Sequence, residues 1–305
     1  MQDIIAPVDK KLIEKELSQN RFLRKTNNAD NEIYVINFHN SPNVMREIGR
    51  LREVSFRTAG GGTGKDCDID DYDTAEAPYE QLIVWDPDEK EIIGGYRFIL
   101  CKNAKFKAPN VPYIATAGLF EFSEKFINEY FPYTIELGRS FVQPNYQSAR
   151  VSRKSLYSLD NLWDGLGALV VNNPDAKYFF GKVTMYTTFN PIARDMILFF
   201  MNKFFPDKDR MIYPKKPLGF KTDVASFDKL FSAESIDENH KILFREVRSF
   251  NENIPPLFNS YMNLSPTMKT FGTAINDTFG GVEETGIMIT ISDIYDIKKE
   301  RHVKY

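Results

Sequence analysis

The chain has 305 residues, enough for one enlarged domain with a sizeable core. Aromatic residues make up 14% of it, including 25 Phe and 15 Tyr, which is enough to line an apolar pocket as well as to fill a core. A formal net charge of -3 supplies no global basic field, so nucleic acid is not expected as a partner. The two cysteines, Cys67 and Cys101, stand far apart and outside any CxxC pair, which predicts neither a disulfide framework nor a metal site.

The N-terminal segment is charged and amphipathic, without the apolar run and small-residue cleavage site of a signal peptide. No stretch of the sequence approaches the roughly 20 apolar residues that a membrane span needs. We therefore expect a cytoplasmic protein, in which peripheral contact with a membrane surface stays open.

The predicted elements mix helices and strands along the chain. Hydrophobic periodicity, capping residues and turn chemistry define them. Helices are predicted at residues 9–20, 42–57, 155–171 and 191–205, and strands at residues 33–39, 80–86, 92–101, 133–142, 178–186 and 286–292. We expect a single α/β domain, with a core at about 33–205 and a C-terminal extension at about 206–305.

The stretch AGGGTGKD, residues 59–66, invites comparison with a phosphate-binding loop. The first glycine of that motif is replaced by Ala59, and Lys65 is followed by Asp66 instead of Ser or Thr. The glycines therefore predict a mobile loop and not a nucleotide site.

Four short motifs contain charged residues, three of them within predicted elements and one in a loop. They are RLREVSFR on the helix at 42–57, DDYD (residues 70–73) in a loop, GGYRF on the strand at 92–101, and ELGRSFV on the strand at 133–142. In a strand, Glu136 and Arg139 point to opposite faces unless a bulge separates them. A bulge would bring both to one site, although each charge taken alone is equally typical of a solvated surface.

In this order the motifs resemble those of the acyl-homoserine-lactone synthases and of the N-acyltransferases that make lyso-ornithine and lyso-glycine lipids, all within the GNAT superfamily. The matching residues are Arg52, Phe56, Asp70, Asp73, Arg97, Glu136 and Arg139. The phrases IELGRSFVQPNYQ, LDNLWDGLGAL, IPPLFNSYMNL and INDTFGG are more similar to the lipid N-acyltransferases. The resemblance covers most of residues 51–281 and implies a GNAT fold, with a mixed central sheet of splayed strands flanked by helices.

The resemblance implies transfer of a 3-hydroxyacyl group from a thioester to the amine of a small amino acid, with glycine favoured over ornithine. Signal-lactone synthesis is the alternative activity, and a catalytically silent acyl-carrier-binding or membrane-associated module is the alternative without activity. Arg52, Phe56, Asp70, Asp73 and Arg97 would shape the acceptor pocket. The charges balance if Arg52, Arg97 and Arg139 pair with Asp70, Asp73 and Glu136, as burial of ions requires.

In the superfamily, backbone N–H groups stabilise the oxyanion where the fourth strand bulges and splays from the fifth. The corresponding strands here are those at 133–142 and 178–186, so the amides of Phe141 and Val142 are the predicted donors. Glu136 is the predicted general base, acting directly or through a water, because an amine is mostly protonated near neutral pH. Cys101 has no recognisable His partner, and we expect a buried, inert thiol.

The segment after the predicted fourth strand, QPNYQSARVSRKS, lacks the glycine-rich pyrophosphate loop of many GNAT enzymes. This departure favours an acyl carrier protein over coenzyme A as the donor, and no cofactor is expected to stay bound. Gln147, Ser148 and Arg150 are the predicted contacts to the phosphopantetheine arm, with Arg153 and Lys154 toward the acidic carrier surface. The same basic residues are equally consistent with a plain solvated face.

Overall fold

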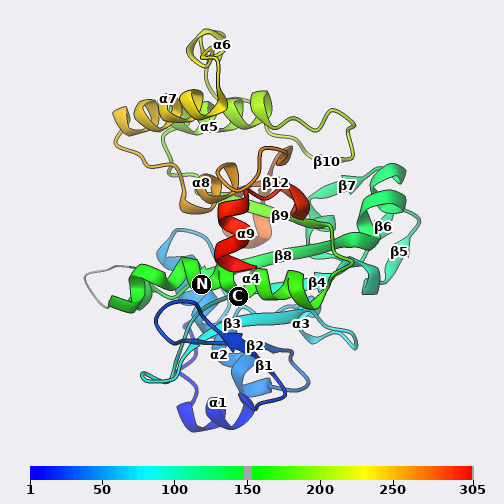
Figure 1. Ribbon diagram of the computed structural model, residues 1–305, viewed down its shortest axis with the longest axis vertical. Helices are drawn as coiled ribbons and strands as arrows, with labels where there is room; N and C mark the ends of the chain where they lie inside the picture. Colours follow the sequence, from blue (N-terminus) through cyan, green and yellow to red (C-terminus); the bar gives the residue numbers. More distant parts are fainter. Residues whose placement is uncertain (148–152, 304–305) are drawn as a thin grey trace.

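The structure, a computed structural model, describes residues 1–147 and 153–303 and is built on one eight-stranded sheet (Figure 1). The strand order is β1-β2-β3-β4-β8-β9-β12-β11, and β8 and β9 form its one parallel pair among the described residues. The strands are β1 (Phe22–Lys25), β2 (Glu32–Ile36), β3 (Glu80–Asp86), β4 (Glu91–Leu100), β8 (Thr134–Val142), β9 (Tyr178–Met185), β11 (Lys269–Asn276) and β12 (Val282–Thr290). The mixed α/β architecture expected from the resemblance is confirmed.

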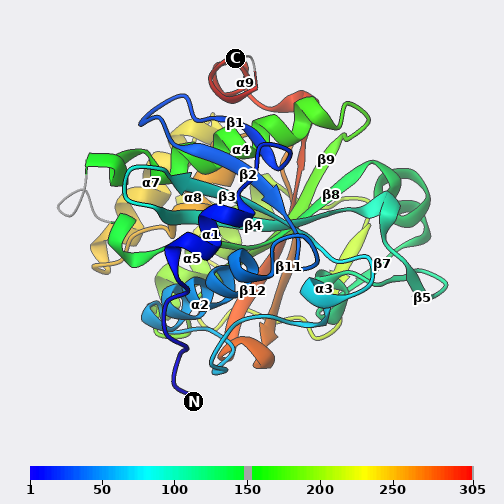
Figure 2. The same cartoon turned by 90° about the horizontal axis from the view of Figure 1, so that it is seen from below.

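Helices cover both faces of this sheet (Figures 1 and 2). One face, here called the front face, carries α1 (Lys10–Glu16), α2 (Pro42–Thr58) and α3 (Asp71–Thr74). The other, the back face, carries α4 (Ser158–Asn172), α5 (Pro191–Phe204), α6 (Phe227–Leu230), α7 (Ile236–Ser249) and α8 (Pro256–Met262), while α9 (Asp296–His302) packs on α4. Apolar residues that alternate along the strands therefore fill two cores, one on each face.

A third apolar cluster lies under two small sheets beside the front face. One pairs β7 (Phe120–Phe122) with β10 (Ile212–Pro214), and the other pairs β5 (Phe106–Ala108) with β6 (Val111–Pro112). Phenylalanines supply most of this cluster, with Phe126 and Phe180 in edge-to-face contact. Many of the aromatic residues that the composition singled out are therefore core packing.

The central elements lie where the sequence predicts them, and the differences fall at the edges. The first helix is shorter than predicted, and DDYD is a helical turn instead of a loop, because the Asp70 side chain accepts hydrogen bonds from the amides of Tyr72 and Asp73 and caps α3. Strands β1 and β11 were not predicted from the sequence. The segment after residue 205, expected to be an extension, completes the sheet: β12 pairs with β9 from Glu283 opposite Met185 to Thr290 opposite Tyr178.

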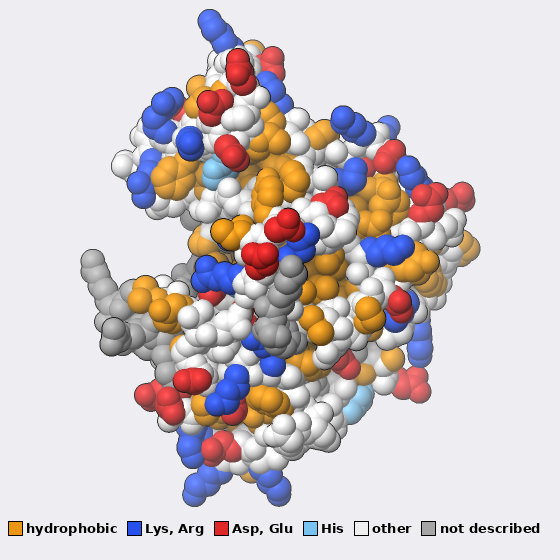
Figure 3. Space-filling model, in the orientation of Figure 1, with side chains coloured by type: hydrophobic (Ala, Val, Ile, Leu, Met, Phe, Trp, Pro, Cys, Tyr) orange, Lys and Arg blue, Asp and Glu red, His pale blue; other side chains and the backbone are white. Residues whose placement is uncertain are grey.

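One face of the molecular surface shows no segregation of charge. On the face drawn in Figure 3, basic and acidic side chains are interspersed among apolar ones. No helix in residues 1–147 and 153–303 is both long and apolar enough to cross a membrane.

Candidate functional site at the divergence of two strands

Strand β8 changes register and direction near its middle. It pairs with β4 at Arg97 opposite Gly138 and again at Gly95 opposite Phe141, so β8 carries one extra residue between these pairs. Arg139, in this bulge, has a φ of 49°, a left-handed conformation uncommon for a residue with a side chain. Parallel pairing with β9 runs from Thr134 to Leu137 and ends there, so the two strands diverge beyond the bulge.

The bulge predicted between Glu136 and Arg139 is therefore present, and it turns both side chains to the front face. Arg139 lies 2.9 Å from the Asp68 carboxylate, and its guanidinium stacks 4.3 Å above the ring of Phe279. Phe279 in turn meets Phe56 edge to face, with ring centroids 5.0 Å apart. The bulge thereby ties the arginine to α2 and to the turn between β11 and β12.

A cleft of about 460 Å³ occupies the opening between the diverging strands. Its volume falls in the range of small-molecule sites. The front-face wall comes from the end of α2, and the back-face wall comes from the starts of α4 and α8. The lining side chains are mostly apolar or hydroxyl-bearing, and they include Ser55, Phe56, Phe141, Val142, Leu159, Thr184, Tyr186 and Leu257.

The amide of Val142 faces this cleft. Its neighbour Gln143 donates from its amide to the Ile93 carbonyl at 2.9 Å, which makes Gln143 and Ile93 a hydrogen-bonded pair of the β4–β8 ladder. Such pairs alternate with pairs whose N–H and C=O groups point away from the partner strand. Val142, opposite Gly94, is in that second position, and its carbonyl accepts from the Gln147 side chain at 2.6 Å instead of from β4. This alternation directs the N–H of Val142 to the opening and the N–H of Phe141 to β4. Of the two predicted oxyanion donors, Val142 is therefore the one that points into the cleft.

Two glycines of β4 permit this close approach of the strands. A Cβ on Gly94 would lie 2.3 Å from the Phe141 carbonyl oxygen, and one on Gly95 would lie 2.6 Å from the Leu82 carbonyl oxygen. Neither oxygen belongs to a flexible side chain that can move aside. The GG of the GGYRF motif is therefore a packing requirement of the bulged ladder.

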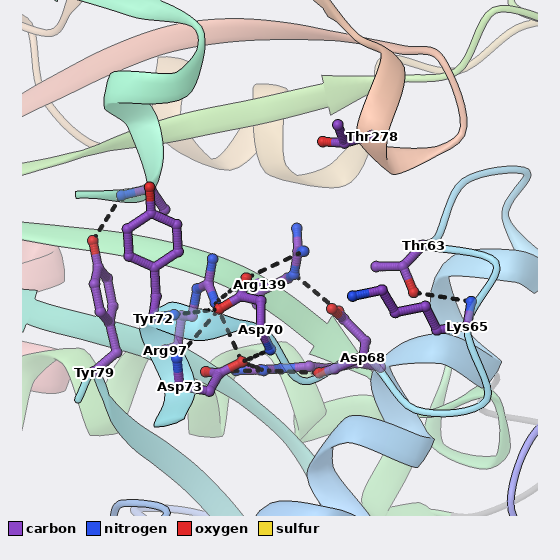
Figure 4. Close-up of polar contacts among 12 residues, drawn as sticks. Thr63, Lys65, Asp68, Asp70, Tyr72, Asp73, Tyr79, Arg97, Arg139 and Thr278 are labelled. Carbon is purple, nitrogen blue, oxygen red and sulfur yellow. Dashed lines mark hydrogen bonds and ion pairs between the residues drawn. The ribbon is translucent and has the colours of Figure 1, made fainter. Parts of the chain in front are cut away.

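Buried ion pairs fill the front face beside the bulge (Figure 4). Arg97 contacts Asp70 at 2.8 Å and Asp73 at 3.3 Å, and Arg52 contacts Asp73 at 3.2 Å. These four side chains, together with Arg139 and Asp68, form what we call the arginine–aspartate network. Arg52 and Asp73 are both fully enclosed, so each ion is tolerated only because it is paired.

Gln81 completes the network at its buried end. Its side-chain oxygen accepts from Arg52, and its nitrogen donates to Asp73 at 3.0 Å. Asp68 and Gln81 were not singled out in the sequence, since an Asp in a loop and a Gln on a strand are common residues there. The signal in the sequence that could have identified Gln81 was the alternation of side chains along β3, which places Gln81 on the same face as Tyr79.

Glu136 is not the third carboxylate of the network, contrary to the charge balance expected from the sequence. Asp68 takes that place. The Glu136 carboxylate is buried, where one oxygen accepts from the Tyr79 hydroxyl and the other accepts from the Thr116 amide at 2.8 Å. Glu136 and these two partners are absent from the lining of the cleft.

The network shifts the acid–base equilibria of its members. Burial opposes ionisation of Asp70, but the charge and hydrogen bonds of Arg97 outweigh it and lower the pKa of Asp70 to about 2. Burial also opposes the charge of Arg97. The negative charges of Asp73 and Asp70 outweigh the effect of burial and raise the pKa of the Arg97 guanidinium. Asp70 and Arg97 are thus held in their charged forms at neutral pH.

The glycine loop at residues 60–64 binds a carboxylate of the chain itself. Glu53, fully buried on α2, accepts from the amides of Thr63 at 3.1 Å and Gly64 at 2.7 Å, and from Arg57 at 2.7 Å. Burial opposes ionisation of Glu53, but these hydrogen bonds outweigh it and lower its pKa. The amides that a phosphate-binding loop would offer to a nucleotide are already occupied, which agrees with the rejection of that motif.

A second ion pair lies across the opening on the front face. Lys182 of β9 contacts Glu284 of β12, which also accepts from Asn276 at 2.9 Å and faces the Thr184 hydroxyl at 3.4 Å. Both charged side chains are largely buried. Neither residue was predicted from the sequence, although Lys182 is the one charge in the otherwise uncharged strand YFFGKVTM.

The remaining predicted residues fall into three groups. Phe56 and Gln147 line the cleft. Ser148 and Arg150 lie outside the described residues. Cys101 is buried, and burial raises the pKa of its thiol well above the usual value, which disfavours a nucleophilic thiolate. Within the described parts of the chain, no group of three or more His, Cys, Asp or Glu side chains is arranged to hold a metal ion.

Comparison with known proteins adds the family context. Residues 51–156 match the family described as Acetyltransferase (GNAT) domain. Two proteins named glycine N(alpha)-acyltransferase, from Phocaeicola vulgatus and Bacteroides thetaiotaomicron, are 56% and 54% identical over 304 residues, covering 100% of this chain and 93% and 90% of theirs. Among solved structures, a coenzyme A-dependent acyl-homoserine lactone synthase aligns over 89% of both chains at 11% identity, with a TM-score of 0.36. An aminoglycoside 6'-N-acetyltransferase with coenzyme A aligns over 84% of this chain and 96% of its own at 12% identity, with a TM-score of 0.33.

Proposed function

Since the chain belongs to the GNAT family that includes the glycine N(alpha)-acyltransferases, and is itself an acyltransferase, we propose that it transfers a 3-hydroxyacyl group from a thioester to the amine of glycine. The observation that carries this proposal is the cleft between β8 and β9, with the Val142 amide on its wall. It lies where the superfamily resemblance predicts the reacting carbonyl.

The thioester carbonyl enters the cleft with its oxygen toward the Val142 N–H. When the glycine nitrogen attacks the carbonyl carbon, the oxygen gains negative charge, and a fixed backbone donor stabilises that charge without reorganising. The tetrahedral intermediate then breaks the C–S bond, which yields an N-acylglycine and a free thiol. Removing one such donor typically costs about 100- to 1000-fold in rate.

The attacking amine must lose a proton, and two carboxylates on the front face compete for the role of general base. Glu136 was predicted from the sequence. Glu136 and Glu284 both have each carboxylate oxygen bonded within the fold, and neither lines the cleft, but the partners of Glu136, Tyr79 and Thr116, are also absent from the cleft wall. Glu284 contacts Thr184, which lines the cleft, and Lys182, which lines the space at its apex. We therefore assign proton removal to Glu284 and its bonded neighbours, and an anchoring role to Glu136.

The arginine–aspartate network supports this chemistry from outside the cleft. It fixes α3 and the segment around Asp68 against the bulge through Arg97 and Arg139. We propose that it shapes the acceptor pocket in this indirect way, together with Phe56, which belongs to both the cleft wall and the contact with Phe279.

The donor is proposed to be an acyl carrier protein, with coenzyme A as the second choice, since the segment after β8 lacks a glycine-rich pyrophosphate loop. Gln147 of this segment lines the cleft, and its side chain donates a hydrogen bond to the Val142 carbonyl. The product would be an amphiphilic N-acyl amino acid, consistent with a role in amino-acid lipid synthesis in the cytoplasm or at a membrane surface.

The test is direct. The purified protein is incubated with glycine and with hydroxyacyl thioesters on either carrier protein or coenzyme A, and products are followed by mass spectrometry and by thiol release. N-acylglycine and thiol in equal amounts are expected. Product with ornithine but not glycine would overturn the acceptor, and absence of any N-acyl product with all these donors and acceptors would overturn the proposed function.

A further inference from the structure

Two cations line the space at the apex of the divergence, where β8 and β9 separate. A cavity of about 40 Å³ lies there, and it adjoins the larger cleft, since Ser140 and Leu257 line both. Arg139 of β8 and Lys182 of β9 line this cavity, whereas no charged side chain among the described residues lines the cleft itself. A negatively charged group of a substrate in the cleft therefore finds its lining cations at the apex.

The two cations differ in how fully the fold already uses them. The Arg139 guanidinium contacts two carboxylates, Asp68 at 2.9 Å and Asp70 at 3.8 Å. The Lys182 ammonium carries three N–H donors, and Glu284 is its one polar partner in the described parts of the chain. Lys182 therefore keeps donors for a ligand, whereas Arg139 is held in the arginine–aspartate network.

The Lys182–Glu284 pair presents charges opposite to those of an amino acid. One Glu284 oxygen faces the hydroxyl of Thr184, a residue of the cleft wall, at 3.4 Å, and the other contacts Lys182. An acceptor with its nitrogen toward the first oxygen has its own carboxyl carbon only two bonds away, on the side of Lys182. A buried carboxylate needs such a cation, because an unpaired buried ion is costly.

Proton removal makes this contact more important as the reaction proceeds. One proton passes from the acceptor ammonium to the Glu284 carboxylate, which becomes neutral and no longer balances the charge of Lys182. The acceptor carboxylate then takes the place of that negative partner, so the buried charges stay paired. An amine without a carboxylate would leave the Lys182 ammonium largely buried and unpaired at this step.

We infer that Lys182 binds the carboxylate of the acceptor and so restricts the reaction to amino acids over other small amines. This inference rests on the proposed function and on proton removal by Glu284, since it concerns the acceptor in that same cleft. A site that pairs a substrate group discriminates against the analogue that lacks it, because its own polar group then stays buried without a partner.

The experiment compares kcat/KM for glycine and for glycinamide, which has the same size and amine but no carboxylate charge, with the thioester donor that the wild-type protein accepts. The wild type is expected to prefer glycine by at least about 100-fold. Lys182→Met keeps most of the side-chain volume and is expected to lower that ratio by at least about tenfold, through lost activity toward glycine. The difference in basicity between the two amines is the same for every variant, so it cancels from the change in ratio.

Lys221→Met is the matched control. Lys221 pairs at 2.7 Å with Glu283, the neighbour of Glu284 on β12, and it lines neither the cavity nor the cleft. This variant should keep the wild-type ratio.

A wild-type protein that uses glycinamide as well as glycine would overturn the inference. So would a Lys182→Met variant that loses activity equally toward both acceptors and keeps the wild-type ratio within twofold, because Lys182 would then only position Glu284. Should Lys182→Met fold poorly by circular dichroism, the same ratio for Lys182→Gln, which can still donate a hydrogen bond to Glu284, decides the matter in its place. Failure of the proposed function looks different, since the wild type would then form no N-acyl product from either acceptor.

Discussion

The arginine–aspartate network and the cleft between β8 and β9 lie side by side and are built in opposite ways. The network concentrates charge: Arg52, Arg97, Asp70 and Asp73 form ion pairs at 3.3 Å or less. Among the described residues, no charged side chain lines the cleft, and the ladder alternation directs the backbone amide of Val142 toward it.

This difference distinguishes the residues that support the site from those that line the proposed site of reaction. Buried ion pairs are rigid and costly to break, which suits a support that holds a loop and a bulge in one arrangement. A reaction that develops charge on a carbonyl oxygen needs a donor that is in place beforehand, and a backbone amide at a strand divergence meets that need. In the proposed mechanism, the residues with the most conspicuous chemistry build the site, and the strand geometry performs the reaction.

Breaking the network should give the largest effect. Arg97→Met keeps most of the side-chain volume but leaves Asp70 and Asp73 buried with less compensating charge. We expect a loss of roughly 3 to 5 kcal/mol in the free energy of unfolding, measured by urea denaturation. Lys105→Met, which removes a well-exposed ion pair with Glu76, is the control and should change stability little. Equal effects of the two substitutions would contradict the role of the network as a frame.

A substitution that distorts the cleft without removing a charged side chain should give the next largest effect. In Gly94→Ala the new Cβ meets the Phe141 carbonyl oxygen at 2.3 Å, which displaces β8 beside Val142. We expect kcat to fall about 100- to 1000-fold, as for loss of an oxyanion donor, in a protein that still folds by circular dichroism. Gly118→Ala, with no other atom within 4 Å, should keep wild-type kcat. A fully active Gly94→Ala variant would argue against the Val142 amide.

Two carboxylates, Glu284 and Glu136, compete for the role of general base, and the substitution of each tests the assignment. Glu284→Gln should lower kcat/KM about 100-fold near neutral pH and remove the acidic limb of its pH profile, as loss of a general base does. Glu136→Gln should keep that limb and instead lower stability by roughly 1 to 2 kcal/mol, since an amide nitrogen cannot accept from both Tyr79 and Thr116. The reverse pattern in the two pH profiles would restore Glu136 as the base.

Acid should weaken the network in a defined range. The pKa of Asp70 is lowered from 3.8 to about 2 in the folded protein, so its contribution is complete above pH 4 and is lost as the pH falls toward 2. This corresponds to roughly 2 kcal/mol of unfolding free energy. Asp70→Asn retains a capping side chain and should lose most of this pH dependence, measured by thermal unfolding at each pH. An unchanged slope would show that other carboxylates govern acid stability.

Much of the fold was predictable because the central elements carry strong local signals. The Pro at the start of α2, the turn between β3 and β4 and the apolar face of α4 each indicate their element directly. The place of β12 in the main sheet was not predictable, since it depends on pairing with β9 across about 100 residues of sequence, and β11 joins the sheet only through β12. Local patterns carry no information about such partners.

Part of the site was also predictable from the sequence. The bulge after Glu136 and the arginines of the network were identified, because charges in apolar strands are conspicuous. Asp68, Lys182 and Glu284 were missed, since their importance comes from tertiary contacts with Arg139 and with one another. The enclosure of Glu136 also arises from distant residues, Tyr79 and Thr116, which strand spacing does not reveal.

The most direct test of this account is the structure of the protein bound to a non-hydrolysable thioester analogue and glycine. We expect the carbonyl oxygen within about 3 Å of the Val142 nitrogen, with no substrate atom in contact with Arg52 or Arg97. A carbonyl bound by the arginines of the network, away from the cleft between β8 and β9, would contradict it.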